Sequence, residues 1–286
     1  MNAKPPPALR LGRPERARAN AAQARAMLSA CRFCAHECGA DRQTGPAGLC
    51  HAGPQARFFA AQTEVTDELE LIPTFAVALN GCDLRCAFCI SGADSWNAGA
   101  SAPFDAGAAA RRAVAALDRG ARTIMLLGGE PTVHLPAALE FVSLLPADAR
   151  LVWKTNAHGS VEARPLLDGM FDVWVADLKF GNDTCARSLA QIAHYSAVVR
   201  GNLLWAAGRA ELIVRHLLMP GHLECCWKPA AQWLASALPG VKTNLRGGFW
   251  PAWQSRRHPQ LRRPVSAAES AAAWAWAQDL GLNLIP

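Results

Sequence analysis

Short apolar runs alternate with longer amphipathic stretches along most of this chain. The apolar runs predict strands at 75–79, 123–127, 151–155, 173–176, 212–218 and 241–245. The intervening stretches predict helices at 108–117, 136–145, 161–167, 195–207, 229–237 and 267–280. Apolar strands that alternate with amphipathic helices form a parallel sheet with right-handed crossovers. The expected fold class is therefore α/β, a partial (β/α)6 TIM-like barrel whose functional face is formed by the loops after the strands.

The N-terminal part of the chain does not follow this alternation. Residues 1–13 include three consecutive prolines and predict an irregular arm, and the Ala- and Arg-rich residues 14–30 predict one exposed helix. Residues 59–72 are acidic and predict a linker, and the small residues of 97–103 predict a flexible segment. We expect three parts: a basic arm and helix (1–30), a four-cysteine metal module (31–58) and the partial barrel (59–286).

The composition is that of a globular protein, with 51% hydrophobic and 18% charged residues. No apolar run reaches the length of a membrane span, so no membrane partner is expected. The basic N-terminus has no hydrophobic segment behind it; a solvated helix is favoured over a transit peptide. The formal net charge of +6 is concentrated in the first thirty residues and in 242–263. Such a surface suits phosphates or an acidic protein, and the lack of any nucleic-acid-binding motif argues against nucleic acid.

Seven of the ten cysteines fall into two close groups, which indicates metal ligands in a reducing cytoplasm and not a disulfide framework. The first group can close a tetrahedral site around zinc or hold an auxiliary iron–sulfur cluster, and its spacing does not separate the two. His36 and His51 lie close enough to replace a ligand, and unligated surface thiols are the alternative. The group consists of Cys31, Cys34, Cys38 and Cys50.

The second group has the spacing C-x3-C-x2-C and follows an apolar run that ends at Asn80-Gly81. It consists of Cys82, Cys86 and Cys89. Three thiolates on one tight loop suit a [4Fe-4S] cluster and leave one iron without a protein ligand, free to take a substrate or cosubstrate. The alternatives are three buried thiols in a core turn, or a zinc knuckle that lacks one ligand.

Polar residues stand at the ends of the next two predicted strands. Gly128-Gly129-Glu130 follows the second strand, where two glycines let backbone approach a ligand and the carboxylate can accept a bond from an ammonium group. We expect Glu130 to be exposed at the barrel mouth; the alternative is that it caps the next helix. Thr155 and Asn156, after the third strand, are expected to contact a ribose or carboxylate, or else to cap the next helix.

The fourth and fifth predicted strands carry charged residues. Asp177 and Lys179 share one face of an extended segment, where they form either part of the cosubstrate site or a structural ion pair. Arg215 can bind a carboxylate or phosphate. His216, on the opposite face of the same strand, is also a candidate for the cosubstrate site. The alternative is a core histidine with satisfied hydrogen bonds, which is the more common role of a single histidine in an apolar strand.

Together these motifs resemble the radical S-adenosylmethionine (radical SAM) superfamily, in its pyruvate formate-lyase activating enzyme-like branch. The resemblance covers the chain from Cys31 to the C-terminus, including CRFCAHECGADRQTGPAGLC, GGEPTVHLPAALE, VADLKFGND, RHLLMPGHLEC and FWPAW. It implies a [4Fe-4S] cluster and S-adenosylmethionine, cleaved to methionine and a 5′-deoxyadenosyl radical that abstracts hydrogen. It also implies that Glu130 contacts the methionyl amino group and that Asp177 and Lys179 lie beside the cosubstrate.

The sequence departs from this branch at two positions. ISGADSW follows Cys89 where relatives commonly carry a Gln-Asn pair, and Lys154-Thr155 stands where relatives often have Asn-Ser. The target therefore stays open between a small molecule in cofactor biosynthesis and a glycyl-radical protein. The expected electron donor is flavodoxin- or ferredoxin-like, and no catalytic residue is assigned. A non-catalytic metal-binding protein and an electron-transfer protein are the alternatives.

Overall fold

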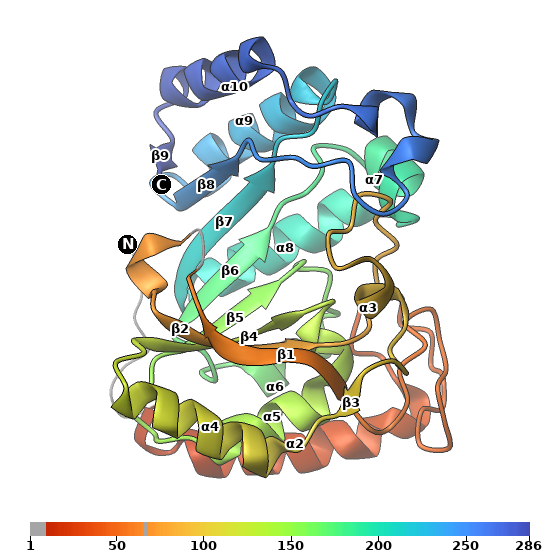
Figure 1. The fold of residues 1–286 in the computed structure, drawn as a ribbon, viewed down its shortest axis with the longest axis vertical. Coiled ribbons are helices and arrows are strands. Elements are labelled where there is room, and N and C mark those ends of the chain that lie inside the picture. The colour runs from red at the N-terminus through yellow and green to blue at the C-terminus, as the bar shows by residue number, and fades with distance from the viewer. Residues whose placement is uncertain (1–9, 66–67) are drawn as a thin grey trace.

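The computed structural model describes residues 10–65 and 68–286. Within them, nine strands form one sheet in the order β3-β1-β2-β4-β5-β6-β7-β8-β9 (Figure 1). The strands are β1 (Arg57–Glu64), β2 (Thr74–Leu79), β3 (Ala102–Pro103), β4 (Thr123–Gly128), β5 (Leu151–Thr155), β6 (Val173–Asp177), β7 (Glu211–Leu217), β8 (Lys242–Arg246) and β9 (Asn283–Leu284). From β2 to β8 the six neighbouring strands pair in parallel, which confirms the expected partial (β/α)6 barrel.

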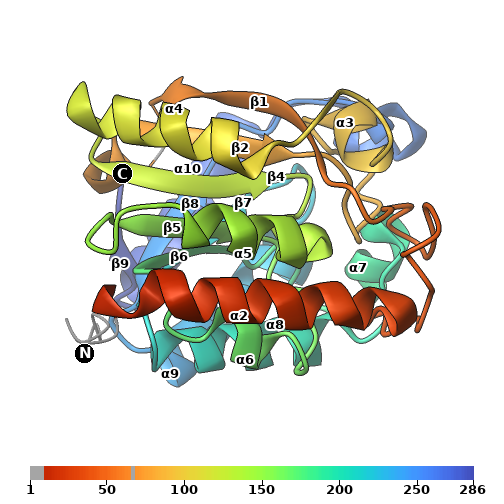
Figure 2. The ribbon, with the colours of Figure 1, turned by 90° about the horizontal axis from the view of Figure 1, so that it is seen from below.

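Helices cover the outer face of this sheet (Figures 1 and 2). The α-helices are α2 (Arg13–Ala26), α3 (Gly92–Trp96), α4 (Ala106–Asp118), α5 (Leu135–Ser143), α6 (Arg164–Leu167), α7 (Asp183–Ala190), α8 (Tyr195–Ala207), α9 (Lys228–Ala237) and α10 (Ala267–Asp279). The 3-10 helices are η1 (Met27–Ala30), η2 (Leu69–Leu71), η3 (Pro131–His134), η5 (Ser255–Arg257) and η6 (Pro259–Arg262). The element η4 (Leu223–Trp227) is a π-helix. No helix in the described ranges is long and apolar enough to cross a membrane.

The strands bury side chains on both faces, which explains their continuous apolar runs. On the outer face they join the helices in one large apolar cluster. On the inner face a separate small cluster fills the barrel, formed by Met125, Val152, Val173, Val175 and Ile213 with Leu71 from η2. Side chains alternate along a strand, so the inner-face positions that follow this cluster are Lys154, Asp177 and Arg215. The apolar filling thus ends below a charged layer at the carboxyl ends of the strands.

Two expectations for the N-terminal half are wrong. The segment predicted as an acidic linker, 59–72, begins inside strand β1, which starts two residues earlier. This strand pairs antiparallel with β2 and carries β3 on its other edge. Residues 66–67 of that linker, and residues 1–9 of the predicted arm, lie outside the described residues. The sequence did not predict this strand because only one of its positions, Ala61, is buried, while Gln62 and Thr63 are exposed.

The predicted exposed helix is instead docked on the barrel. Figure 2 shows α2 lying on the outside of the molecule beside α5 and α6, and it packs chiefly on α5. Ala17, Ala21 and Ala24 form its buried face, because their small side chains allow the two helices to approach closely. At its start the buried Arg13 pairs with Asp172 at 2.9 Å and donates to the Ala147 and Ala149 carbonyls.

Candidate functional site

The three cysteines of the C-x3-C-x2-C motif lie on one loop that leaves the carboxyl end of β2. Cys82 and Cys86 are buried and Cys89 is half-buried, and all three are free thiols. In a parallel barrel this is the end at which functional loops gather. We call residues 80–91 the cluster loop.

Main-chain bonds from distant segments fix the cluster loop. The Arg85 N–H donates to the Ala190 carbonyl at 3.0 Å, and the Ala87 N–H donates to the Leu189 carbonyl at 2.8 Å. The Ala87 carbonyl accepts from the Gln254 N–H at 2.8 Å. The loop is therefore held from α7 on one side and from the C-terminal segment on the other.

The three sulfur atoms of the cluster loop are not gathered as the ligands of one ion are. Four sulfurs around one zinc ion lie about 3.8 Å apart, because each Zn–S bond is about 2.3 Å. Within residues 10–65 and 68–286, Cys82, Cys86 and Cys89 do not form a group with ligand atoms within 4.8 Å of one another. Ligands of a cubane bind different irons and stand farther apart. The donor set, three thiols on one buried loop, therefore fits a [4Fe-4S] cluster.

The surroundings of these thiols disfavour free thiolates. Burial raises the pKa of Cys86 to about 12, against the opposing effect of Lys179. Burial also raises the pKa of Cys82 well above its usual value. The Leu84 N–H and the Asn156 amide lie 3.4 and 3.7 Å from the Cys82 sulfur, where they can donate to it. Bound metal would supply the positive charge that stabilises the deprotonated sulfurs.

Gly128 and Gly129 each lie against the main chain of a neighbouring segment. A Cβ at Gly128 would lie 2.1 Å from the Leu79 carbonyl oxygen, and one at Gly129 would lie 2.0 Å from the Gly81 oxygen. The Gly129 and Glu130 N–H groups donate to those same carbonyls at 2.8 and 2.9 Å. The glycines thus let the end of β4 pack directly on the start of the cluster loop.

The expectation that Glu130 is exposed at the barrel mouth is wrong. Its side chain is buried and caps η3, where Oε1 accepts from the Thr132 N–H at 3.0 Å and hydroxyl at 2.6 Å. Oε1 also accepts from the Thr155 hydroxyl at 2.8 Å, and Oε2 accepts from the Asn156 N–H at 2.7 Å. Burial, and then the charge of Asp83, raise the pKa of Glu130 to about 7. Glu130 therefore ties the loops after β4 and β5 together.

Asn156 continues this buried network to the cluster loop. Its amide donates to Asp83 Oδ1 at 2.7 Å, and His158 Nδ1 lies 2.8 Å from Asp83 Oδ2. Burial opposes ionisation of Asp83, but the bonds and charge of His158 hold the pKa of this carboxyl below its usual value. Sequence reasoning missed Asp83 and His158. Asp83 could have been singled out because it directly follows Cys82, and His158 because it stands two positions after Asn156.

The charged residues of the fourth and fifth strands meet inside the barrel mouth. Lys179 forms an ion pair with Asp177, and Arg215 lies 3.8 Å from Asp177 and 3.4 Å from Glu68. Lys154 pairs with Glu68 at 3.3 Å. Burial disfavours the charge of Asp177, but Lys179 and Arg215 lower its pKa. We call Glu68, Lys154, Asp177, Lys179 and Arg215 the charged layer.

His216 points away from this layer, as the alternation of a strand requires. Its Nδ1 atom lies 2.6 Å from the Leu178 carbonyl oxygen, so it can donate there, and its ring packs on Trp227 at 4.9 Å between centroids. Burial lowers the pKa of His216 to about 4. The structure thus places His216 in the outer core and does not bring it together with Arg215.

The N-terminal cysteines lie beside the cluster loop. His36 Nε2 lies 3.0 Å from the Asp83 carbonyl oxygen, and the Arg85 guanidinium bonds both the Cys82 and Leu49 carbonyls. Within the described ranges the sulfurs of this set are not gathered within 4.8 Å, so no preformed single-ion site is seen. Metal binding by the set remains a prediction. Its members are Cys31, Cys34, Cys38 and Cys50.

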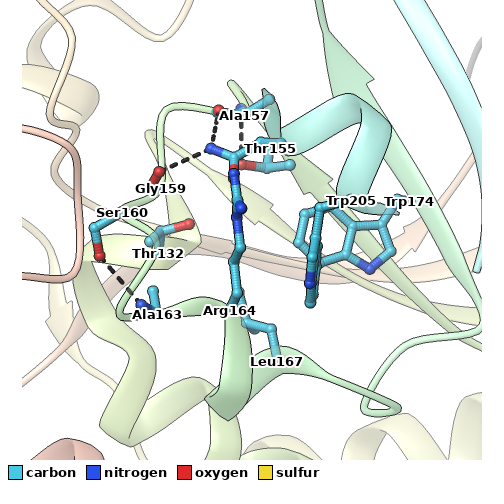
Figure 3. Close-up of a pocket in the computed structure, with 11 residues that line it drawn as sticks. Thr132, Thr155, Ala157, Gly159, Ser160, Ala163, Arg164, Leu167, Trp174 and Trp205 are labelled. Carbon is cyan, nitrogen blue, oxygen red and sulfur yellow. Dashed lines mark hydrogen bonds between the residues drawn. The ribbon is translucent and has the colours of Figure 1, made fainter. Parts of the chain in front are cut away.

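A small pocket opens on the helix side of this region. Figure 3 shows Arg164 between Thr155 and Leu167, with Trp174 and Trp205 to one side. The Arg164 Nε donates to Asn202 at 2.9 Å. The Asn202 amide also donates to the Ala157 and Gly159 carbonyls, so the polar groups of the pocket join α6 and α8 to the loop after β5.

Comparisons with known proteins agree with this architecture. An uncharacterized protein of Methanocaldococcus jannaschii, MJ0674, is 28% identical over 265 residues, which cover 89% of this chain and 76% of that protein. Streptococcus suis SuiB, solved with its precursor peptide SuiA and with S-adenosylmethionine, superposes with a TM-score of 0.55 at 15% identity. The match covers 71% of this chain and 46% of the peptide-bound SuiB chain, so this chain spans about half the length of SuiB.

A domain of a Bacteroides vulgatus pyruvate-formate lyase-activating enzyme aligns with a TM-score of 0.45 at 17% identity, covering 57% of this chain and 97% of that domain. Residues 77–234, more than half of the chain, match the sequence profile of the Radical SAM superfamily. The matched region begins in β2, before the cluster loop, and includes every strand from β4 to β7. The chain therefore belongs to the radical SAM superfamily.

Proposed function

We propose that this protein is a radical SAM enzyme that holds a [4Fe-4S] cluster on Cys82, Cys86 and Cys89 and reductively cleaves S-adenosylmethionine. The observation that carries the proposal is the position of three free thiols on one loop at the carboxyl end of β2, within the matched region. When bound, the reduced cluster and S-adenosylmethionine supply a 5′-deoxyadenosyl radical. The protein's part is to seat the cosubstrate and to exclude water.

The charged layer is the proposed seat of the cosubstrate. S-adenosylmethionine carries an ammonium group, a carboxylate and a sulfonium, so it needs partners of both signs. Asp177 offers a carboxylate, and Lys154, Lys179 and Arg215 offer cations, all near the carboxyl ends of β5, β6 and β7. The fully buried Glu68 pairs with Lys154 and Arg215 and so helps to hold them in place. The buried Glu130, Thr155 and Asn156 position the loops around this seat. This assignment moves the direct contacts from Glu130 to the charged layer.

The N-terminal cysteine set is proposed to hold a closed metal site that is structural or conducts electrons. Four thiolates leave no coordination position for S-adenosylmethionine. The bond of His36 to the cluster loop, and the bond of Arg85 from that loop to the Leu49 carbonyl, support a role beside the cluster. The hydrogen donor is proposed to be a small molecule or a glycyl-radical protein.

Reductive cleavage tests the proposal directly. Cys82→Ala, Cys86→Ala and Cys89→Ala each remove one of three protein ligands and are expected to abolish 5′-deoxyadenosine formation by reconstituted, dithionite-reduced protein. Paramagnetic resonance of the reduced wild type is expected to show a cluster signal that changes when S-adenosylmethionine is added. Cys38→Ala, in the other cysteine set, is the control and should keep this change. Undiminished 5′-deoxyadenosine formation by any of the three cluster-loop variants would contradict the proposal.

A further inference from the structure

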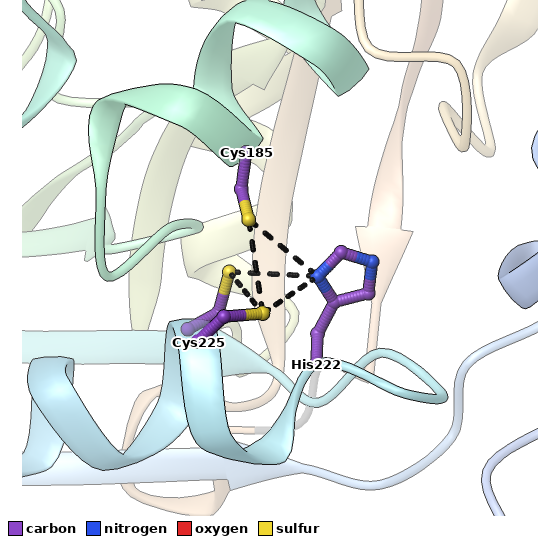
Figure 4. Close-up of side chains that lie close together, drawn as sticks. Cys185, His222 and Cys225 are labelled. Carbon is purple, nitrogen blue, oxygen red and sulfur yellow. Dashed lines mark hydrogen bonds between the residues drawn. The ribbon is translucent and has the colours of Figure 1, made fainter.

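The three cysteines outside the two sequence groups come together in space. They are Cys185 in α7, and Cys225 and Cys226 in the π-helix η4, and the imidazole of His222 joins them just before that helix. Figure 4 shows the Cys185, His222 and Cys225 side chains pointing toward a common centre. In sequence the group spans 42 positions, from 185 to 226, so its spacing does not suggest one site. Adjacent parallel strands β6 and β7 bring their following loops side by side.

The separations of the ligand atoms are those of one tetrahedral ion. The Cys185 and Cys225 sulfurs are 3.7 Å apart, and the Cys225 and Cys226 sulfurs are 3.9 Å apart. His222 Nδ1 lies 3.3, 3.7 and 3.8 Å from the sulfurs of Cys225, Cys226 and Cys185. A zinc ion with bonds of about 2.3 Å to sulfur and 2.0–2.1 Å to nitrogen requires edges of about 3.8 Å and 3.6 Å.

This geometry differs from the two groups found in sequence. Within residues 10–65 and 68–286, neither the cluster-loop cysteines nor the N-terminal set gathers its sulfurs within 4.8 Å, whereas these four ligand atoms all lie within that distance. The site also has a supporting polar group, because the Asn182 amide lies 3.4 Å from the Cys185 sulfur and donates to the Cys225 carbonyl. Ligand sulfurs in metal sites commonly receive such bonds.

We infer that Cys185, His222, Cys225 and Cys226 form a closed zinc site that joins the loop after β7 to helix α7. The metal is assigned by its ligands, since three thiolates and one imidazole in a tetrahedron suit zinc. Four protein ligands leave no open position, so the site is structural. It pins the segments that follow Asp177, Lys179 and Arg215, and so stabilises the barrel mouth. The inference does not depend on the proposed function.

The experiment measures zinc and thiol reactivity at this site in the full chain. Zinc per chain is determined on protein purified without oxygen, for the wild type, Cys185→Ser and His222→Asn. His258→Asn is the matched control, a nearby histidine outside the group. Since the site holds one ion, the two ligand variants are expected to bind about one zinc equivalent less than the wild type and the control. The difference is informative whatever the N-terminal cysteines bind.

Iodoacetamide labelling of the wild type gives a second readout that needs no variant to fold. Cys185 and Cys225 are half-buried, so they are expected to be protected in zinc-loaded protein and alkylated after chelation. Peptide mass spectrometry assigns the label to each cysteine. The inference would be overturned if the wild type and the ligand variants held equal amounts of zinc. It would also be overturned if alkylation were the same before and after chelation, or if the native protein had a disulfide within the group.

Discussion

At the scale of the residue, Glu130 is the position at which the structure most changes the expected role. Its carboxylate accepts from two main-chain N–H groups and two hydroxyls, all in a buried setting. Each buried donor left without a partner costs about 1–3 kcal/mol. The side chain therefore stabilises the fold around the site first, and affects the cosubstrate only through the loops that it holds.

We expect Glu130→Ala to lower the free energy of unfolding by about 2 kcal/mol or more, because it orphans these donors. Denaturant titration of the variant and the wild type measures the loss. Glu162→Ala, which removes an exposed carboxylate paired with Arg32, is the control and should stay within about 0.5 kcal/mol. A Glu130→Ala protein as stable as the wild type, with weakened S-adenosylmethionine binding, would restore the role expected from the sequence.

His216 gives a pH dependence with a defined sign. Burial lowers its folded-state pKa from 6.5 to about 4, so the unfolded chain takes up the proton first as the pH falls. Above pH 6.5 His216 is neutral in both states and the free energy of unfolding does not depend on it. Between pH 6.5 and pH 4 protonation of the unfolded chain lowers the free energy of unfolding by about 1.4 kcal/mol per pH unit. We expect His216→Gln to lose less stability than the wild type across this window. Thermal unfolding at a series of pH values tests this, with His258→Gln as control; parallel curves for wild type and His216→Gln would refute it.

At the scale of the element, α2 is anchored by one buried charge and one small-residue face. Arg13 bonds Asp172 and three main-chain carbonyls. Asp172 also accepts from the Leu151 N–H at 2.8 Å and pairs with Arg10 at 2.7 Å. Removing one member of a buried pair leaves the other charge uncompensated, which costs roughly 3–5 kcal/mol. The helix start is thereby fixed to the amino ends of β5 and β6.

Arg13→Ala is expected to destabilise the protein by roughly 3 kcal/mol, at the low end of that range because Arg10 still pairs with Asp172. Denaturant unfolding gives the magnitude, and limited proteolysis should show earlier cleavage within 13–26. Arg18→Ala, an exposed arginine on the same helix, should change neither result. Loss of stability in both variants alike would mean that helix propensity, and not the buried pair, is responsible.

Strands and helices could be predicted from the sequence where the pattern of apolar residues alone identifies them. The six parallel strands could be predicted because burial on both faces makes their apolar runs continuous. Strand β1 could not, since most of its positions are partly exposed, and the buried face of α2 is alanine, which hydropathy does not distinguish from a solvated face. The C-x3-C-x2-C motif could be recognised because its three cysteines are close together in the sequence. The link of Asp83 to His158, and the Cys185–His222 group, depend on which loops the fold places side by side.

At the scale of the whole molecule, the cluster loop faces a basic and aromatic surface. The main chain at Gln254 bonds the loop, and Trp253 packs on Trp96 at 5.7 Å between centroids. Ile90, Trp250 and Trp253 are 83%, 72% and 44% exposed. The exposed Arg256 and Arg257 follow directly. An acidic redox protein that docks here would reach the half-buried Cys89 side of the loop.

Reversing this charge is expected to slow reduction by such a donor. The double variant Arg256→Glu/Arg257→Glu should be reduced about tenfold more slowly by flavodoxin, with weaker dependence on ionic strength, because steering is lost. Its reduction by dithionite, a small chemical donor, should be unchanged. Arg18→Glu/Arg111→Glu carries the same charge change at exposed arginines elsewhere and is the control. Equal flavodoxin rates for both double variants would place the donor elsewhere.

The bonds that fix the cluster loop also bear on how the protein matures. Cys82, Cys86 and Cys89 leave the ribosome early, but the loop that carries them bonds to Leu189, Ala190 and Gln254. Because translation proceeds from the N-terminus, the loop cannot take its final conformation until nearly the whole chain has been made. Iron delivered to a nascent chain would meet three unrestrained thiols. If these cysteines hold the proposed cluster, we expect its insertion to follow assembly of the barrel, because the loop reaches its final conformation only then.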